Sequence, residues 1–224
     1  MMQLPDGTSE PPIDAWHDVT VTSLLARLGV LRGDRPVLVA VDGRSGAGKS
    51  TLARRLADAV PDAAVVATDD IAWNLSMFDW ARELATNVLI PVRRGQSVRY
   101  RPPGWITHDR PGAVVVPAAR SLLIVEGVGS SQAALAHLLD AALWVQSDAA
   151  VARRLGLARD IASGANGDEP ASVAFWDEWG AAERVFLERE EPWLRASAIV
   201  AGVPLATDQD LLCAISPHRA PVGT

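Results

Sequence analysis

One eight-residue segment constrains this chain more than any other part of it. Residues 43–50 read Gly-Arg-Ser-Gly-Ala-Gly-Lys-Ser and match the pattern G-x-x-x-x-G-K-[ST] at every position. A Val-rich apolar run at residues 36–41 precedes the segment, and an amphipathic helical pattern at residues 50–60 follows it. In this strand–loop–helix setting, glycines bring backbone N–H groups against phosphate oxygens, and the helix adds its positive end. The segment therefore predicts a phosphate-binding P-loop (Walker A).

The side chains at the end of this loop point to a nucleoside triphosphate. Lys49 is the single lysine among 21 basic residues, and its compact ammonium suits the space beneath β- and γ-phosphates better than a planar guanidinium does. The Ser50 hydroxyl can ligate Mg²⁺. We therefore expect ATP and Mg²⁺ as cofactors. The residues expected to bind the nucleotide are Gly43, Ser45, Gly46, Ala47, Gly48, Lys49, Ser50 and Thr51.

Apolar runs that alternate with helical patterns predict the fold class. Strands that are apolar throughout belong to parallel sheets whose two faces are both covered by helices. The chain is therefore predicted to be α/β, a P-loop NTPase with a five-stranded parallel sheet and helices on both faces. The expected strands are residues 36–41, 63–67, 121–125, 141–145 and 198–201, and the expected helices are residues 19–31, 50–60, 80–89, 131–139, 148–161 and 172–191.

The length of 224 residues fits one domain. We expect a flexible, Pro-rich leader at residues 1–15, a single domain at residues 16–215 and an irregular tail at residues 216–224. The long insertion at residues 69–119 is predicted to be a substrate flap, and residues 148–170 a lid with a glycine-rich hinge.

Composition narrows the class of partner. The net charge of −6 argues against a nucleic-acid-binding surface. No apolar stretch approaches the length of a membrane span, and the N-terminus lacks a signal-peptide pattern. Cys213 is the only cysteine, so no intrachain disulfide forms. We expect a cytoplasmic protein with a small-molecule partner and no nucleic-acid or membrane partner, and a homodimer is left open.

Carboxylates follow two of the predicted strands. Because ligands of parallel sheets bind at the carboxyl ends of the strands, these groups are expected to face the ligand. Asp69 or its neighbour Asp70 can orient an acceptor hydroxyl and take its proton, or can simply cap the next helix. Glu126 can hold a Mg²⁺-bound water, or can make a structural hydrogen bond to the loop backbone.

Further segments stand out beside the loop at residues 42–51. They are Asp69-Asp70, Phe78-Asp79-Trp80, the stretch at 88–102 with Tyr100-Arg101-Pro102, Glu126-Gly127, Arg153-Arg154 and Arg159-Asp160. Together these residues resemble the uridine kinase, phosphoribulokinase and pantothenate kinase group, and the similarity spans about residues 36–202. The resemblance implies an ATP-dependent kinase, with a nucleoside- or nucleotide-kinase-like fold, that transfers the γ-phosphoryl group to a hydroxyl of a nucleoside or related metabolite.

The resemblance also assigns roles to individual residues. Lys49, Asp69, Arg154 and Arg159 are expected to be catalytic, with the arginines of the lid (Arg153 among them) reaching over the phosphates. The alternative is that these arginines form a solvated helix face. Substrate contacts are expected from Asp69, Asp70, Tyr100, Arg101, Trp105 and His108, although flap aromatics equally suit packing of the loop onto the domain.

Other classes of P-loop protein are less consistent with the sequence. Guanine-specific GTPases need a second lysine for an Asn/Thr-Lys-x-Asp element, and no transporter-type LSGGQ stretch occurs. A nucleotide-dependent regulatory ATPase, with a protein partner in place of a small-molecule acceptor, stays open.

Overall fold

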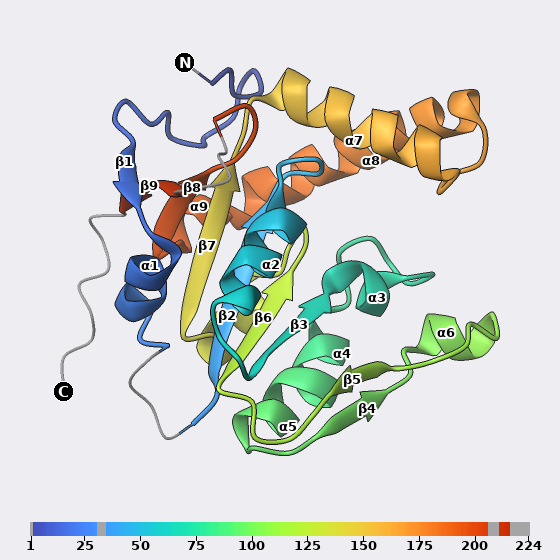
Figure 1. Cartoon of the computed structure of the whole chain (residues 1–224). Coiled ribbons are helices and arrows are strands. Elements are labelled where there is room, and N and C mark those ends of the chain that lie inside the picture. Colours follow the sequence, from blue (N-terminus) through green and yellow to red (C-terminus); the bar gives the residue numbers. More distant parts are fainter. Residues whose placement is uncertain (1, 31–34, 206–210, 216–224) are drawn as a thin grey trace.

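The computed structural model describes residues 2–30, 35–205 and 211–215 (Figure 1). Its centre is a seven-stranded sheet in the order β1-β9-β8-β7-β2-β6-β3. In that order the strands are His17–Val19, Leu211–Ile215, Ala198–Ala201, Ala141–Gln146, Val37–Gly43, Leu122–Glu126 and Ala63–Ala67.

The five neighbouring strands β8, β7, β2, β6 and β3 pair in parallel. They are the five strands expected from the sequence, so the α/β fold with a five-stranded parallel sheet is confirmed. Strands β9 and β1 extend this sheet at one edge as antiparallel neighbours, and they were not predicted. A three-residue strand shows no periodicity, and a five-residue apolar run near the end of a chain does not distinguish strand from helix.

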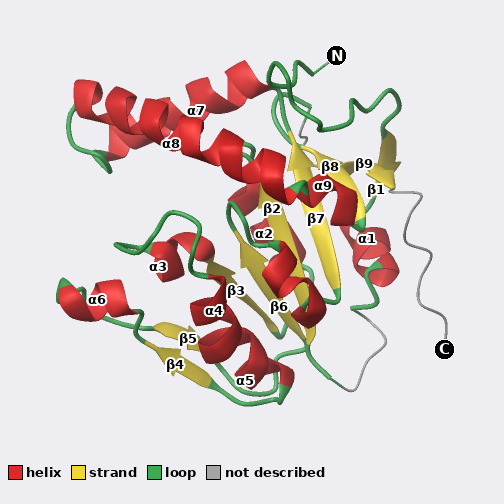
Figure 2. Ribbon diagram, turned by 180° about the vertical axis from the view of Figure 1, so that it is seen from behind, coloured by secondary structure: helices red, strands yellow, loops and turns green. Residues whose placement is uncertain are grey.

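Alternate residues of the central strand enter opposite cores. Val37, Val39 and Val41 pack in the cluster that contains α1 (Val21–Arg27) and α2 (Lys49–Asp58). Leu38 belongs to the cluster on the other face. Figures 1 and 2 show α1 and α2 on one face of the sheet, and helices α4, α8 and α9 on the other.

The helices after β7 form an antiparallel pair. Helix α7 (Ala149–Ser163) is capped by the Asp148 carboxylate, which accepts a hydrogen bond from the Val151 N–H group. Helix α8 (Glu169–Glu190) begins three residues before the expected start, because the Asp168 carboxylate caps it through the Ala171 N–H group. The short helix α9 (Pro192–Arg195) follows directly.

The expected helix at residues 80–89 is divided. It consists of α4 (Ala81–Leu84), a π-helical turn at Ala85–Leu89 and α5 (Ile90–Arg93). The expected helix at residues 131–139 is a 3₁₀ helix over Ala133–Leu138.

The predicted flap contains more regular structure than its Pro- and Gly-rich sequence indicates. After the short helix α3 (Thr68–Ala72) and α4, strands β4 (Val98–Tyr100) and β5 (Val114–Val116) form an antiparallel ladder. Helix α6 (Pro103–Thr107) lies at the tip of this ladder (Figure 1). The apolar side chains of the flap share one core with a face of the central sheet: Trp80, Leu84, Val98, Trp105 and Val116 belong to the same cluster as Leu38.

The segment expected to be a flexible leader packs against the domain. Its Glu10 is only 4% exposed, and Ile13 and Trp16 pack against the aromatic cluster around Trp193. The expected tail at residues 216–224 lies outside the described residues. Within the described ranges, no helix combines the length and apolarity that crossing a bilayer would require.

A buried carboxylate ties the end of the central strand to its neighbour. Asp42 accepts hydrogen bonds from the N–H groups of Gly43, Gly129 and Ser131 and from the Ser131 hydroxyl, at 2.7 to 2.9 Å. Burial raises the pKa of the Asp42 carboxyl, although these four hydrogen bonds oppose that effect. Asp42 thereby fixes the segment after β6 against the start of the glycine-rich loop.

Replacement of Asp42 by Asn should destabilise the protein by about 2 kcal/mol or more, because an amide NH₂ group would face buried N–H donors. Urea unfolding measures the change. Asp62→Asn is the control, because the Asp62 side chain is 66% exposed and lies 4.0 Å from Arg120. The control should shift stability by less than about 0.5 kcal/mol. Equal effects of the two substitutions would contradict the role of Asp42.

Candidate active site

The glycine-rich loop has a backbone that only glycines adopt readily. Gly46 and Gly48 have φ angles of 76° and 99°. A Cβ atom on Gly46 would lie 2.1 Å from the carbonyl oxygen of Ala152, so the loop passes directly beneath α7. Gly48 is the left-handed N-cap of α2, a helix of ten residues whose positive end therefore meets the loop.

Lys49 is the first residue of α2, and it folds back across the loop. Its ammonium donates a hydrogen bond to the carbonyl oxygen of Arg44 at 2.9 Å, and the residue is 8% exposed. The loop therefore encloses a positive charge beside N–H groups at a helix N-terminus, an arrangement suited to a polyanion.

Glu126 lies between the two strands that carry the other predicted site residues. In the sheet it is paired with Val41 on one side and with Ala67 on the other. Its carboxylate accepts a hydrogen bond from the Ser50 hydroxyl at 3.1 Å. The alternative role, a hydrogen bond from Glu126 to the loop backbone, is not what the structure shows.

The electrostatic surroundings of Glu126 identify its neighbours. Burial raises the pKa of the Glu126 carboxyl, and the Asp69 carboxylate raises it further. Lys49, the hydrogen bond from Ser50 and Arg159 act in the opposite direction. Four predicted residues from three separate parts of the sequence thus act on the same carboxyl group.

Asp69 is exposed in the first turn of α3. The N-cap of this helix is Ala67, so neither Asp69 nor Asp70 caps it. Asp70 instead pairs with Arg110 of the flap at 2.8 Å. The two adjacent aspartates therefore differ: Asp69 acts on Glu126, and Asp70 belongs to the contacts of the flap.

The three predicted lid arginines diverge around α7. Arg159 acts on Glu126 and also pairs with Asp160 at 2.8 Å. Arg153 bonds to Asp177 of α8 at 2.7 Å. Arg154 is exposed and acts electrostatically on Asp148 at the start of α7. Of the three, Arg159 is the one whose charge acts on Glu126. The roles of Arg154 and Arg159 at the phosphates stay predictions.

Trp105 is a packing residue of the flap. It is 5% exposed, its indole N–H donates to the carbonyl oxygen of Asp70 at 2.8 Å, and the Arg110 guanidinium lies 3.8 Å from the ring centroid. Its ring is therefore covered, which favours the alternative role of Trp105, packing within the flap, over the expected contact with a substrate.

Two further flap residues are also engaged within the flap. The Tyr100 hydroxyl donates to the Glu83 carboxylate of α4, and burial together with this carboxylate raises the pKa of Tyr100. The Arg101 guanidinium donates to the carbonyl oxygen of Arg110 at 2.8 Å. His108 is exposed, with its ring 5.6 Å from that of Trp73.

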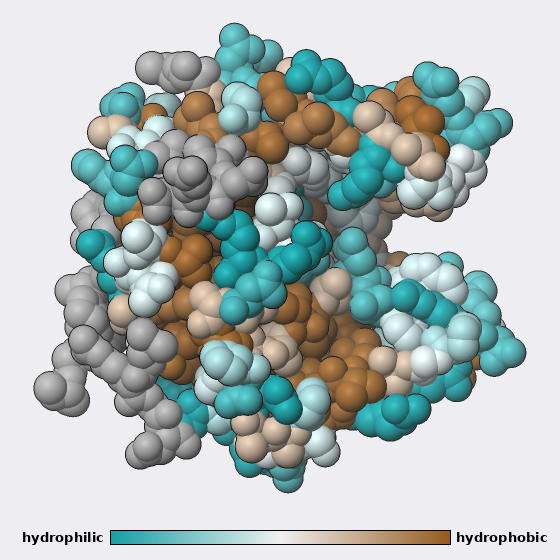
Figure 3. Space-filling model, in the orientation of Figure 1, coloured by the Kyte–Doolittle hydropathy of each residue, from teal (hydrophilic) through white to brown (hydrophobic). Residues whose placement is uncertain are grey.

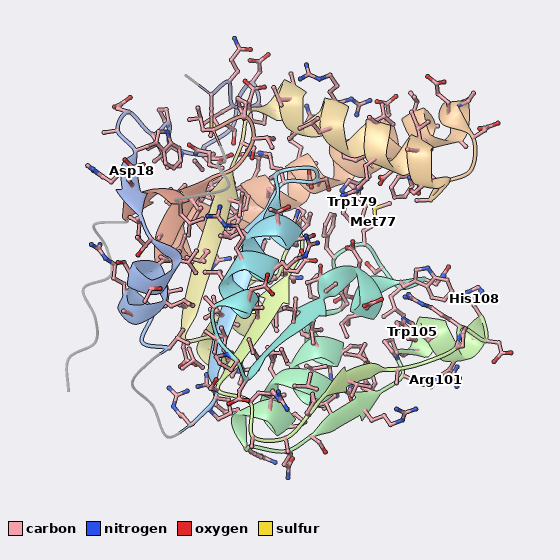
Figure 4. The ribbon with its side chains drawn as sticks, viewed as in Figure 1. Asp18, Met77, Arg101, Trp105, His108 and Trp179 are labelled. Atoms are coloured by element: carbon pink, nitrogen blue, oxygen red, sulfur yellow. The ribbon has the colours of Figure 1, made fainter. Side chains whose placement is uncertain are left out.

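An open hollow separates the flap from the helices after β7. Figure 3 shows it on the right of the molecule, between the surface over α7 and α8 above and the surface over α3 and α6 below. Arg101, Trp105 and His108 lie on the lower arm in Figure 4, whereas Trp179 descends from the upper arm.

Sequence reasoning missed the groups that hold Ser45 of the loop. The Glu183 carboxylate of α8 accepts hydrogen bonds from the N–H and hydroxyl groups of Ser45, each at 2.8 Å. The Trp179 indole N–H donates to the same hydroxyl at 2.7 Å. Glu183 follows Trp176 and Trp179 at seven and four residues, so a carboxylate on the buried stripe of a helix was the available signal.

The oxygen donors fit a magnesium ion that arrives with its nucleotide. Among the described residues, no group of three or more His, Cys, Asp or Glu side chains could hold a metal ion. Ser50 and Glu126 supply two adjacent oxygen ligands, and Mg²⁺ prefers oxygen, often with only one or two protein ligands besides phosphates and water.

Comparison with solved structures shows the fold. Neither a protein-family model nor a curated protein matches the sequence. A structure from a Silicibacter species, described as a "putative fructose transport system kinase", is similar with a TM-score of 0.56 and 20% identity over 80% of this chain and 96% of that chain. A possible uridine kinase from Bacillus stearothermophilus gives a TM-score of 0.44 and 15% identity over 79% and 98%. The predicted fold of a P-loop kinase is confirmed by the first likeness.

Replacement of Glu126 by Gln should stabilise the nucleotide-free protein at high pH. A carboxyl whose pKa is raised by folding favours the folded state below its ordinary pKa, and that contribution is lost as the pH rises through the raised pKa. Gln keeps the oxygen that accepts from Ser50 and has no charge to bury.

In urea unfolding, the free energy of unfolding of Glu126→Gln should therefore be higher than that of the wild type at pH 8 and equal to it near pH 4. Glu178→Gln, at an exposed position of α8, is the control and should show no such difference. A wild type that is the more stable protein at pH 8 would refute the prediction.

Proposed function

We propose that this chain is an ATP-dependent, uridine kinase-like enzyme that transfers the γ-phosphoryl group to a hydroxyl of a small molecule. The observation that carries the proposal is the glycine-rich loop at the N-terminus of α2, with the Lys49 ammonium folded across it and the Ser50 hydroxyl bonded to Glu126. We further propose that it acts in the cytoplasm on a nucleoside or related metabolite.

The loop would bind the triphosphate. Its N–H groups and the positive end of α2 favour phosphate oxygens. An ammonium has three N–H donors, and the carbonyl oxygen of Arg44 takes one of those of Lys49. Lys49 thus approaches the β- and γ-phosphates while it stays bound to the loop. Ser50, with Glu126 through water, would hold Mg²⁺, which supplies compensation of the phosphate charge.

Asp69 is the group best placed to handle the acceptor. Its exposed carboxylate can accept a hydrogen bond from the acceptor hydroxyl and orient the acceptor oxygen toward the γ-phosphorus. It can take the proton as the new P–O bond forms and the bond from the γ-phosphorus to the bridging oxygen breaks, with ADP as the leaving group. Arg159, whose charge acts on Glu126 as that of Lys49 does, would offset the negative charge that develops on the transferred group.

The acceptor is to be found by assay. The protein is incubated with Mg-ATP and a panel of nucleosides, pantothenate and sugars that includes uridine and fructose, and phosphorylated products are detected by mass spectrometry. We expect transfer to one class of acceptor. Binding of ATP without transfer to any acceptor would favour the regulatory ATPase.

Asp69→Asn should lower kcat for transfer by about 100-fold or more, because the amide cannot take the proton, and should leave the Kd of ATP within about twofold of the wild type. Asp70→Asn is the matched control on the same turn; it breaks the pair with Arg110 and should keep most of kcat. Equal losses of kcat in both variants would contradict the assignment of Asp69.

Lys49→Ala should weaken ATP binding and lower kcat/KM by about 100-fold, since the charge that meets the phosphates is lost. Calorimetry measures the first effect and steady-state kinetics the second. Arg54→Ala removes an exposed cation from the same helix and should change neither quantity. Unchanged ATP affinity in Lys49→Ala would count against the phosphate site.

A further inference from the structure

A buried ion pair links the N-terminal segment to the phosphate loop. The Glu10 carboxylate accepts hydrogen bonds from Nη2 and Nε of Arg44, at 2.8 and 3.2 Å. The side chains of Glu10 and Arg44 are 1% and 9% exposed. A pair so deeply buried is costly to break, because the partner that remains is an uncompensated charge.

The other oxygen of the Glu10 carboxylate is also fully engaged. It accepts from the Trp144 indole N–H at 2.6 Å and from the Gln146 amide at 3.0 Å, both at the carboxyl end of β7. Glu10 is therefore fixed to the strand adjacent to the loop strand, and its position is set by the sheet rather than by the loop.

Arg44 transmits this position to the reactive end of the loop. It is the second residue of the loop, its guanidinium also donates to the Thr8 hydroxyl at 3.2 Å, and it lies 5.9 Å from the centroid of the Trp193 ring. Its carbonyl oxygen accepts a hydrogen bond from the ammonium of Lys49. Held from both its side chain and its carbonyl, Arg44 connects Glu10 to Lys49.

We infer that Glu10 is a positioning residue of the nucleotide site, which orients Arg44 and, through the Arg44 carbonyl, the ammonium of Lys49. The inference rests on the proposed function, since it assumes that the loop binds ATP. It assigns to the N-terminal segment a part in nucleotide binding that lies outside the loop motif.

The test compares two substitutions of adjacent residues by calorimetric titration with ATP. Glu10→Gln keeps the size of the side chain and an oxygen for Trp144 and Gln146, and removes the charge that faces Arg44. Ser9→Ala removes hydroxyl contacts of the same segment with Glu188 of α8 and with Glu191, the C-cap of that helix, and does not touch the loop.

Glu10→Gln should raise the Kd of ATP about tenfold relative to the wild type, as loss of a charge-assisted hydrogen bond does. Ser9→Ala should leave the Kd within twofold, even where it lowers the melting temperature. A Glu10→Gln protein that binds ATP as the wild type does would overturn the inference and leave the proposed function intact. A wild type that binds no ATP would overturn both.

A second variant covers the case in which Glu10→Gln leaves Arg44 unpaired and the protein unfolded. The double substitution Glu10→Gln with Arg44→Gln buries no net charge, so its folding does not depend on the ion pair. It should also bind ATP about tenfold more weakly than the wild type, because the link to Lys49 is gone. Affinity equal to that of the wild type would again refute the role of Glu10.

Discussion

The register of three parallel strands is the constraint on which the rest of this structure depends. Glu126 stands beside Val41, which leads into the glycine-rich loop, and beside Ala67, which leads into Asp69. Because the carboxyl ends of parallel strands meet at one edge of the sheet, strand pairing alone brings together groups that are tens of residues apart in sequence. A shift of one residue in β6 would turn Glu126 to the opposite face and separate it from Ser50.

The charges around the loop explain how an acidic chain offers a positive site. Three carboxylates lie around the loop, and each accepts a hydrogen bond from one of its first three residues. Asp42 accepts from the Gly43 N–H group, Glu10 from the Arg44 guanidinium and Glu183 from the Ser45 N–H group. Carboxylates that are paired or hydrogen-bonded in this way fix the loop. Within the described residues, the Lys49 ammonium donates a hydrogen bond to a neutral carbonyl oxygen, and its charge acts on the carboxyl group of Glu126.

Features that are encoded by periodic patterns or by local motifs were predicted from the sequence. All five parallel strands, the loop, and the positions of Asp69 and Glu126 at strand ends followed from apolar runs and from where they stop. Residues whose roles depend on tertiary packing were not predictable. Trp105 could equally recognise a ligand or fill the flap, and burial decided for the flap. Arg153 and Arg159 lie on the same helix, and the sequence does not show that α8 packs beside it and supplies Asp177 as the partner of Arg153. Glu10 lies in a Pro-rich stretch with no pattern that marks it as buried.

Aromatic side chains connect the two arms that border the hollow. Phe78, from the loop after α3, stacks on Phe186 of α8 with ring centroids 4.1 Å apart and lies 5.2 Å from Trp179; Figure 4 draws Met77 just below Trp179. The Trp179 indole also donates to the Ser45 hydroxyl, so these packed rings lie beside the glycine-rich loop. The segment after α3 and helix α8 are therefore joined next to the loop by aromatic side chains rather than by pairing of their backbones.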